Sequence, residues 1–411
     1  MANFNFCGKI TLGKESEKFK PVMKQTFDSG WTMTTVKFNC LSDTNRVMCV
    51  AQGGKWGNDA KNSVKTFSKT VTDANGNVTK GTSIEIPWDK RFDTDQIAKV
   101  AGFKKFIVDT GNKKLRYQLQ DLVSAFEKGN ATDDKMEELG VYNLNDAKAA
   151  LEKSWDKRKE FISEWDFVQY LIRVCKNDKM KEKKFDISGV YDVQYNPVNG
   201  KFYTNYRVNR VILAADDAKP STEMKVDFFY GENAWNDDTY DETGKCFING
   251  FISYYDSNKD VRKNGFMPFT VTVKEEDGRR LRGLKRKFDI EDGVKQIGLT
   301  LKVVDGAERK EITMDDLDEE TREDIECGLL DFESVVKALG GNVYRDRVSE
   351  IRFEELTEKK NIPQDTTYTI EDMHPARKSV NNEVDDKVAN DIKEIMADMD
   401  KELPFDLDDD L

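Results

Sequence analysis

Histidine is almost absent from this chain, which has 411 residues and a single histidine, His374. Histidine is the side chain that most often acts as a general base near neutral pH, and it is the commonest metal ligand. The one histidine lies in the polar segment Asp372-Met373-His374-Pro375, where a surface position is the ordinary interpretation. Catalysis through a histidine base and histidine-rich metal sites are therefore not expected.

Cysteine pairs and long apolar runs are also missing. The six cysteines are scattered, form no Cys-x-x-Cys pair and have mostly apolar neighbours, which predicts reduced, buried thiols and no zinc site. No apolar run approaches the roughly 18 residues of a membrane-spanning helix. The first six residues, 1–6, lack the charged and apolar blocks of a secretion signal. A cytoplasmic protein without a membrane partner is expected.

Enzymatic sequence motifs are not found either. The chain has no glycine-rich phosphate loop, no Gly-x-Ser-x-Gly elbow, no His-Glu-x-x-His and no EF-hand loop. The acid pairs Asp237-Asp238 and Asp315-Asp316 are of the kind that a metal-dependent nuclease uses, but in a chain with 77 acidic residues such pairs are usually solvated surface. We predict a protein that is not an enzyme, with no cofactor, no catalytic residue and no metal. A nuclease is kept as the weaker alternative.

Acidic charge is confined to two blocks. The net charge is −12, yet residues 383–411 alone carry −9 and residues 311–333 carry −10, so the remainder carries about +7. The charge distribution is therefore that of a mildly basic body with two acidic segments, and not that of a uniformly acidic protein. The body can meet a polyanion, and the acidic segments can compete for the same surface.

An internal repeat is the main signal of organisation. Phe4-Asn5-Phe6-Cys7-Gly8 and Phe185-Asp186-Ile187-Ser188-Gly189 share the form Phe-x-apolar-small-Gly. In both copies there follow a strand rich in aromatic and β-branched residues, a strand that ends in glycine, and a Trp-Asx loop at Trp56 or Trp235. Four landmarks in the same order predict two diverged copies of one β-rich unit.

Each copy holds about five short strands, with a glycine near the middle of the first, which favours a small Greek-key barrel of the OB type. An immunoglobulin-like sandwich is the alternative. We predict an α+β, mainly β fold: two tandem OB-like β-barrels with a helical insertion between them and a disordered acidic C-terminal tail. The predicted domains are 1–116 (first OB-like β unit), 117–184 (helical linker region), 185–278 (second OB-like β unit), 279–375 (small α+β region) and 376–411 (flexible acidic tail). Within the linker, apolar spacing predicts one helix around 119–126 and a longer one over 151–172.

Aromatic and basic residues are interleaved on the predicted strands. Single-stranded nucleic acid needs cations along its phosphates and exposed rings on which bases stack. Rings on a strand more often pack a core, but Trp56 and Trp235 lie in loops rich in glycine and asparagine. The candidate DNA-binding residues are Trp31, Lys37, Lys55, Trp56, Trp88, Lys90, Arg91, Phe202, Tyr203, Tyr206, Arg207, Arg210, Trp235, Arg262, Lys263, Arg279, Arg280 and Arg282.

The densest basic segment is Arg279-Arg280-Leu281-Arg282-Gly283-Leu284-Lys285-Arg286-Lys287, with six cations in nine residues. Arginine suits planar, bidentate contact with phosphate. This segment is a candidate for phosphate contact. The acidic block 311–333 of the same chain is the alternative partner.

The C-terminal residues 401–411 combine a Pro-Phe pair with a run of aspartates: the candidate partner-binding residues are Pro404, Phe405, Asp406, Asp408, Asp409 and Asp410. This segment resembles the acidic C-terminal tip of bacterial and bacteriophage single-stranded DNA-binding proteins, although in the bacterial proteins the phenylalanine is last and here six residues follow it. The tandem β units are also similar to phage proteins with OB-like cores.

The resemblance implies sequence-tolerant coating of single-stranded DNA in phage or mobile-element replication or recombination. The tail would then regulate binding or recruit replication or recombination proteins, in the host cytoplasm if the chain is phage-encoded. RNA is an alternative ligand. The alternative function is a virion or assembly protein whose immunoglobulin-like β-domains mediate protein contacts.

Overall fold

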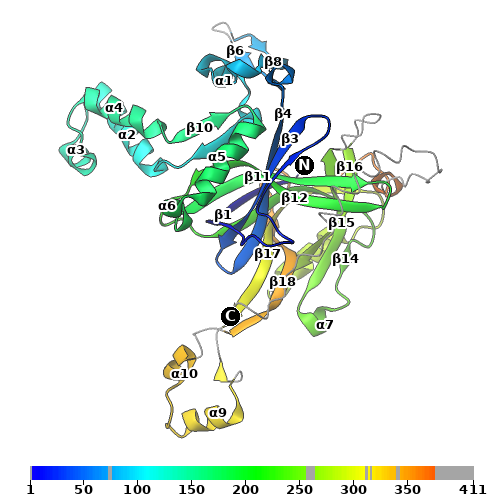
Figure 1. The fold of residues 1–411 in the computed structure, drawn as a ribbon. Helices are drawn as coiled ribbons and strands as arrows, with labels where there is room; N and C mark the ends of the chain where they lie inside the picture. Colours follow the sequence, from blue (N-terminus) through cyan, green and yellow to red (C-terminus); the bar gives the residue numbers. More distant parts are fainter. Residues whose placement is uncertain are drawn as a thin grey trace.

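The structure is a computed structural model that describes residues 2–72, 76–255, 264–310, 313–314, 317–338 and 343–374. Fifteen strands are hydrogen-bonded into one continuous sheet, with helices around it (Figure 1). The fold is therefore α+β and mainly β, as predicted. Within the described ranges, every helix is too short or too polar to cross a membrane. The tail, residues 376–411, lies outside the described residues.

Five strands close into a first ring of backbone hydrogen bonds. Pairing runs from β1 to β3, β4, β12, β11 and back to β1, and it is antiparallel except between β4 and β12. That parallel pair closes the ring at Tyr206↔Cys49 and Arg207↔Val50. The strands are β1 (Asn3–Leu12), β3 (Trp31–Ser42), β4 (Asn45–Trp56), β11 (Lys184–Asn196) and β12 (Lys201–Leu213), with β2 (Val22–Thr26) beside β3.

A second ring of five strands follows with the same order. Pairing runs β13, β15, β16, β18, β17 and back to β13, and the closing pair β16–β18 is again parallel, at Thr272↔Arg352. The strands are β13 (Ser221–Tyr230), β15 (Cys246–Tyr255), β16 (Asn264–Val273), β17 (Lys295–Lys310) and β18 (Val343–Leu356), with β14 (Trp235–Asn236) beside β15 and β19 (Gln364–Asp365) beside β17. β1 also pairs with β13 and joins the rings. The immunoglobulin-like alternative requires two facing antiparallel sheets, and the strands do not pair in that way.

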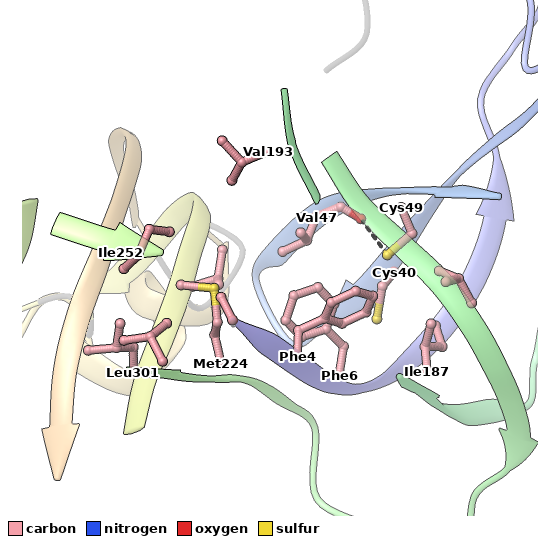
Figure 2. Packing of buried hydrophobic residues seen from close by; sticks show 14 of the residues in the cluster. Phe4, Phe6, Cys40, Val47, Cys49, Ile187, Val193, Met224, Ile252 and Leu301 are labelled. Carbon is pink, nitrogen blue, oxygen red and sulfur yellow. Dashed lines mark hydrogen bonds between the residues drawn. The ribbon is translucent and has the colours of Figure 1, made fainter. Parts of the chain in front are cut away.

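Alternate residues of these strands point into the rings and form one shared core. Phe4 and Phe6 lie side by side in the first ring, next to Cys40, and Met224 lies near Leu301 in the second (Figure 2). Five of the six cysteines are buried free thiols, as predicted, and Cys327 is exposed. Burial raises the pKa of Cys40 and of Cys175 to about 12, which keeps both thiols protonated.

A long insertion separates β4 from β11. Val64, Ile86 and Val100 of its first part build a small core with Ile162, which lies just before α5, and its helices α2 to α4 build another around Leu122. Helix α5 instead packs on the first ring through Phe167, Val168 and Leu171. The elements are η1 (Asp59–Lys61), β5 (Ser63–Phe67), β6 (Val71–Thr72), β7 (Val78–Thr79), β8 (Ser83–Pro87), η2 (Trp88–Lys90), α1 (Thr94–Lys99), η3 (Gly102–Lys104), β9 (Phe106–Asp109), α2 (Lys113–Glu127), α3 (Asp133–Leu139), α4 (Leu144–Trp155), β10 (Arg158–Phe161), α5 (Glu164–Lys176) and α6 (Asp178–Lys181).

The second ring carries its own helices. Helix α8 (Gly278–Phe288) lies between the third and fourth strands, the position that α5 holds in the first ring. Helices α9 (Glu319–Glu326) and α10 (Phe332–Ala338) lie at the far end of the β17–β18 hairpin, away from both rings (Figure 1). The remaining elements are α7 (Tyr240–Thr243) and η5 (Glu371–Met373).

The predicted boundary at residue 185 does not follow the strand pairing, because β11 and β12 complete the first ring and not the second. The shared motif Phe-x-apolar-small-Gly predicts the start of each unit, but its second copy lies in a strand of the first ring. A Cβ on Gly8 would overlap the carbonyl of Leu41, and one on Gly189 would overlap that of Arg207. The motif therefore marks close contact with a neighbouring strand, a requirement that any strand of a tight ring can have.

Two further boundaries differ from the prediction. The helix predicted over 151–172 is interrupted: α4 ends at Trp155, β10 pairs with β9, and α5 starts after Ser163, whose hydroxyl accepts from the Asp166 backbone N–H. The region 279–375 is not separate, since its strands β17 and β18 belong to the second ring. The predicted helix around 119–126 lies within α2.

Candidate nucleic-acid interface

The outer surface of β3, β4 and β12 brings together five of the predicted residues. Val36, Phe38 and Cys40 of β3 are buried in the ring, so the alternate residue Lys37 points outward. Lys37 pairs with Val50 of β4, and Val50 pairs with Arg207 of β12. Directly paired residues on neighbouring strands point to the same side of a sheet. We call this surface the outer face; it carries Trp31, Lys37, Trp56, Tyr203 and Arg207.

Two tryptophans lie at one end of the outer face. Trp31 and Trp56 are direct cross-strand partners, and their rings meet edge to face with centroids 5.2 Å apart and an interplanar angle of 71°. Gly54 makes this possible, because a Cβ there would overlap the Trp31 indole. The side chain of Asn62 holds the Trp56 backbone with hydrogen bonds of 2.8 Å and 3.0 Å. Both indoles are half-buried, so each presents part of its ring to solvent.

The cations of the outer face are held in different ways. Arg207 donates to Glu164 at 2.8 Å, which fixes its guanidinium beside the N-terminus of α5. Lys55 has the opposite parity on β4 and lies off the outer face, 3.2 Å from Asp59, with its Nζ 5.8 Å from the Trp165 ring centroid. Lys37 has no ion pair with any other described residue. Lys37 is thus the cation of this face that can most readily take a phosphate.

The hairpin of β11 and β12 places some aromatic side chains on the outer face and others inside the first ring. Tyr203 has the same strand parity as Arg207 and faces outward, and its hydroxyl accepts from the Asn199 amide at 2.9 Å. Tyr206 lies in the ring, 5.4 Å from Phe4 and 5.1 Å from Phe6 between centroids. Burial raises its pKa well above the ordinary value. Tyr206 is therefore a core residue and not a surface platform.

Phe202 also packs internally, against Tyr195 at 4.9 Å and against Tyr254 of the second ring at 6.0 Å between centroids. Trp235 is only 9% exposed and belongs to the shared core. Its loop resembles that of Trp56 in sequence, but β14 draws it against β15. The prediction that Phe202 and Trp235 bind DNA is therefore wrong: both side chains pack inside the protein.

Trp88 and Arg91 make packing and ion-pair contacts within the insertion and with α5. The Arg91 guanidinium lies 4.0 Å from the Trp88 ring centroid and donates to Asp166 of α5 at 2.7 Å. Trp88 packs on the small core around Ile86. Lys90 is exposed beside them, and Arg210 donates to the carbonyl of Gly102 at 3.2 Å. Four predicted residues, Trp88, Lys90, Arg91 and Arg210, thus lie where the insertion joins the first ring.

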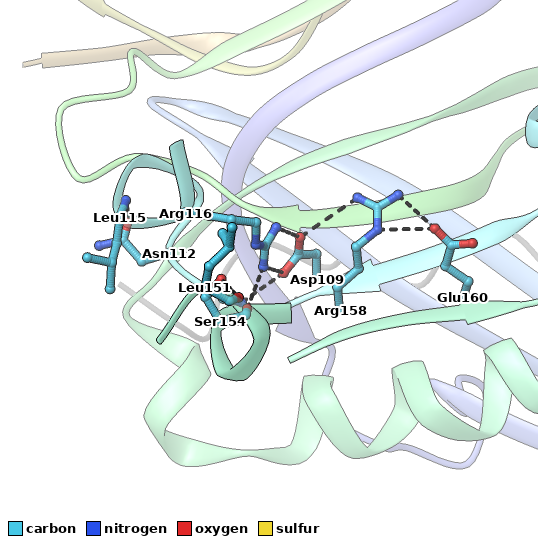
Figure 3. A network of polar contacts seen from close by, with 9 residues as sticks. Asp109, Asn112, Leu115, Arg116, Leu151, Ser154, Arg158 and Glu160 are labelled. Carbon is cyan, nitrogen blue, oxygen red and sulfur yellow. Dashed lines mark hydrogen bonds and ion pairs between the residues drawn. The ribbon is translucent and has the colours of Figure 1, made fainter. Parts of the chain in front are cut away.

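A buried ion pair anchors α2 (Figure 3). Arg116 donates to both carboxylate oxygens of Asp109, at 2.7 Å and 3.1 Å, and to the carbonyl of Ser154 at 2.9 Å. Arg158 lies 3.9 Å from Asp109 and 3.0 Å from Glu160. Burial by itself raises the pKa of Glu160, but hydrogen bonds from Lys105 and Arg158 outweigh it and leave that pKa below the ordinary value. Sequence reasoning did not find this network.

The predicted basic segment forms α8. Its first arginine, Arg279, is exposed, and Asp277 caps the helix by accepting from its backbone N–H at 2.8 Å. Arg280 pairs with Glu275 at 3.1 Å and lies 5.9 Å from the Phe353 ring centroid. Arg282 is exposed. The three arginines are separate from the outer face in the strand order, since α8 belongs to the second ring.

Several predicted residues lie outside the described part of the chain. They are Arg262, Lys263, Asp315, Asp316, Pro404, Phe405, Asp406, Asp408, Asp409 and Asp410. Of the other acid pair, Asp237 forms an ion pair with Lys285 at 2.7 Å. Across the described residues, no group of three or more His, Cys, Asp or Glu side chains is arranged to hold a metal ion.

Sequence reasoning missed the polar residues between the predicted ones. Gln52, which pairs with Thr35, has outward parity on β4, and its amide donates to the sulfur of Met33 at 2.7 Å. Asn39 pairs with Met48 on the same side. Strict alternation along Val36 to Cys40 was the signal that could have found Asn39.

Comparisons with known proteins give little. No protein-family model matches the chain, and no curated protein matches its sequence. Among solved structures, a deletion mutant of the single-stranded DNA binding protein from Thermus aquaticus matches with a TM-score of 0.25 and 7% identity, over 74% of this chain and 87% of that one. A likeness at this level supports no statement about the fold or the function of this chain.

Proposed function

We propose that this protein binds single-stranded DNA without sequence preference, through the outer face of the first ring. The observation that carries the proposal is the joint presence of Trp31, Trp56, Lys37 and Arg207 on that face. Partly exposed rings can stack on any base, and neighbouring cations follow the phosphates. Asn39 and Gln52 add hydrogen-bonding groups of the kind that bind without reading one sequence.

The proposal extends to the fold: each ring is taken as an OB-like barrel. The order first-second-third-fifth-fourth, the parallel closure and the helix between the third and fourth strands all support it. OB-folds bind oligonucleotides on the face of their second and third strands. In the first ring those strands are β3 and β4, which carry both tryptophans. Trp31 to Asn39 spans about 27 Å of strand, enough for several nucleotides.

The second ring is a poorer candidate for the same role. Its second and third strands carry Phe251 and Phe266, and both pack against the segment that follows β19. Tyr368 lies 4.9 Å from Phe266, and His374 lies 5.5 Å from Phe251, between ring centroids. With these rings covered, we assign the main DNA contact to the first ring.

We further propose a non-enzymatic role: coating single strands in phage or mobile-element replication or recombination, with RNA as an alternative ligand. The tail would regulate this binding, or recruit replication or recombination proteins. The support for the tail's part is its charge of −9 over residues 383–411, which can compete with phosphates for basic groups.

Fluorescence titration with oligo-dT at several salt concentrations tests the proposal. We expect tryptophan quenching, and an affinity that falls steeply as salt rises because counterions are released from the DNA. Absence of quenching and of any mobility shift at low salt would refute it. Loss of the oligonucleotide only when magnesium is added would instead support the nuclease alternative.

A further inference from the structure

One face of α8 carries three exposed arginines. Arg279, Arg282 and Arg286 are spaced i, i+3 and i+7, which places them on one side of the helix. The opposite side is buried through Leu284 and Phe288. Within the described part of the chain, none of the three arginines takes part in a side-chain ion pair. We call them the arginine row.

The other cations of α8 are already engaged. Arg280 pairs with Glu275 at 3.1 Å, Lys285 pairs with Asp237 at 2.7 Å, and Lys287 donates to the carbonyl of Asn361 at 3.3 Å. Hydrogen bonding to Asp237 raises the pKa of Lys285. Acids of the second ring therefore neutralise Arg280 and Lys285, and a carbonyl holds Lys287, whereas the arginine row can bind another partner.

Helix α9 carries the opposite charge at a matching spacing. Glu319, Glu323 and Glu326 are exposed and spaced i, i+4 and i+7, again on one side. They too form no side-chain ion pair with any described residue. Neither α9 nor α10 contributes a buried residue, and both lie at the tip of the β17–β18 hairpin (Figure 1). We call these three residues the glutamate row.

The two rows fit each other when the helices run antiparallel. Each row extends over seven residue steps, or about 10.5 Å along its helix. In antiparallel order the pairs are Arg279 with Glu326, Arg282 with Glu323, and Arg286 with Glu319. Antiparallel packing also sets the helix dipoles favourably. Inside one chain the rows do not meet, because no ion pair joins them among the described residues.

We propose that the arginine row of one copy docks on the glutamate row of a second copy of this chain. Such a contact joins two different surfaces, so it is head-to-tail and leaves one row free at each end. It can therefore repeat along a row of copies. On a DNA strand, neighbouring copies would be held at high effective concentration, and this weak contact would make their binding cooperative.

Single-stranded DNA is the competing partner for the arginine row. DNA coating needs rings next to the cations, and α8 has no exposed aromatic residue among its described positions. One described aromatic ring lies next to a cation of α8: the ring of Phe353, which is half-buried beside Arg280. Charge and spacing favour the glutamate row.

Sedimentation velocity of the full chain at low salt, without DNA, tests the proposal. Wild type should associate as its concentration rises. Arg279→Glu/Arg282→Glu/Arg286→Glu should weaken association by roughly tenfold or more, because three pairs become repulsive. Glu319→Arg/Glu323→Arg/Glu326→Arg should do the same. A chain that carries all six substitutions restores opposite charges and should associate again.

The control is Lys114→Glu/Lys128→Glu/Lys153→Glu, which changes net charge equally at exposed lysines of the insertion. It should associate as wild type does. A monomeric wild type, or a sixfold variant that stays monomeric, overturns the proposal. The proposal is also overturned if the arginine-row variant, but neither the glutamate-row variant nor the lysine control, loses affinity for an oligo-dT so short that it holds one copy. Because association is measured without DNA, its failure leaves the proposed function standing.

Discussion

Removing the paired tryptophans is the perturbation that the outer face makes most informative. Base stacking on an aromatic side chain is worth roughly 1–3 kcal/mol per base. Trp31 and Trp56 are half-buried and meet edge to face at 5.2 Å, so each offers part of a ring and supports the other. We therefore expect the lower part of that range, about 1–2 kcal/mol, for Trp31→Ala or Trp56→Ala alone. This is roughly a 5- to 30-fold loss of affinity.

The double variant should lose less than the sum of the single losses, because each substitution already removes the neighbour's support. Fluorescence anisotropy with labelled oligo-dT at one fixed salt concentration measures these affinities, and thermal unfolding checks that the variants fold. Tyr142→Ala is the matched control, since Tyr142 is 65% exposed in the insertion. If the double variant binds oligo-dT as tightly as wild type, the tryptophan pair is not a stacking platform and the reasoning is wrong.

Four further outcomes are expected. Lys37→Ala should lower the salt slope of log affinity by about 0.7, the share of one phosphate contact on a single strand; an unchanged slope counts against this contact. Arg116→Met removes the bidentate partner of the buried Asp109 carboxylate and leaves Arg158, 3.9 Å away, as its remaining cation, so α2 should lose about 3–5 kcal/mol of local stability in hydrogen exchange, while oligo-dT affinity stays unchanged. The pKa of Glu160 is lowered on folding, so its contribution to stability is present above its unfolded pKa and is lost as pH falls through its folded pKa; Glu160→Gln should flatten that part of the pH–stability curve measured by urea unfolding. Deleting residues 384–411 should tighten oligo-dT binding at low salt, and equal affinity would remove competition by the tail.

The fold class could be predicted from strand patterns, but the domain boundaries could not. Strands rich in aromatic and β-branched residues predicted the mainly β class, while pairing partners depend on contacts between residues far apart in sequence. Gly8 and Gly189 carry the same local pattern because both approach a neighbouring strand closely. Local sequence therefore shows that a close contact exists, but not which ring the strand joins.

The same limit applies to the candidate residues. Trp56 and Trp235 lie in similar glycine- and asparagine-rich segments, yet one is half-buried on the outer face and the other is 9% exposed in the core. Tyr203 and Tyr206 are three residues apart on one strand and point to opposite sides. Register decides such cases, and the sequence alone left it open.

The location of DNA on the protein is the most direct test of the account. Oligo-dT that contains a photoreactive uracil can be cross-linked to the protein, and the modified peptides can be identified by mass spectrometry. The account predicts that cross-links concentrate at Trp31, Trp56 and Tyr203 on the outer face. Cross-links confined to α8, to the insertion or to the second ring would contradict it.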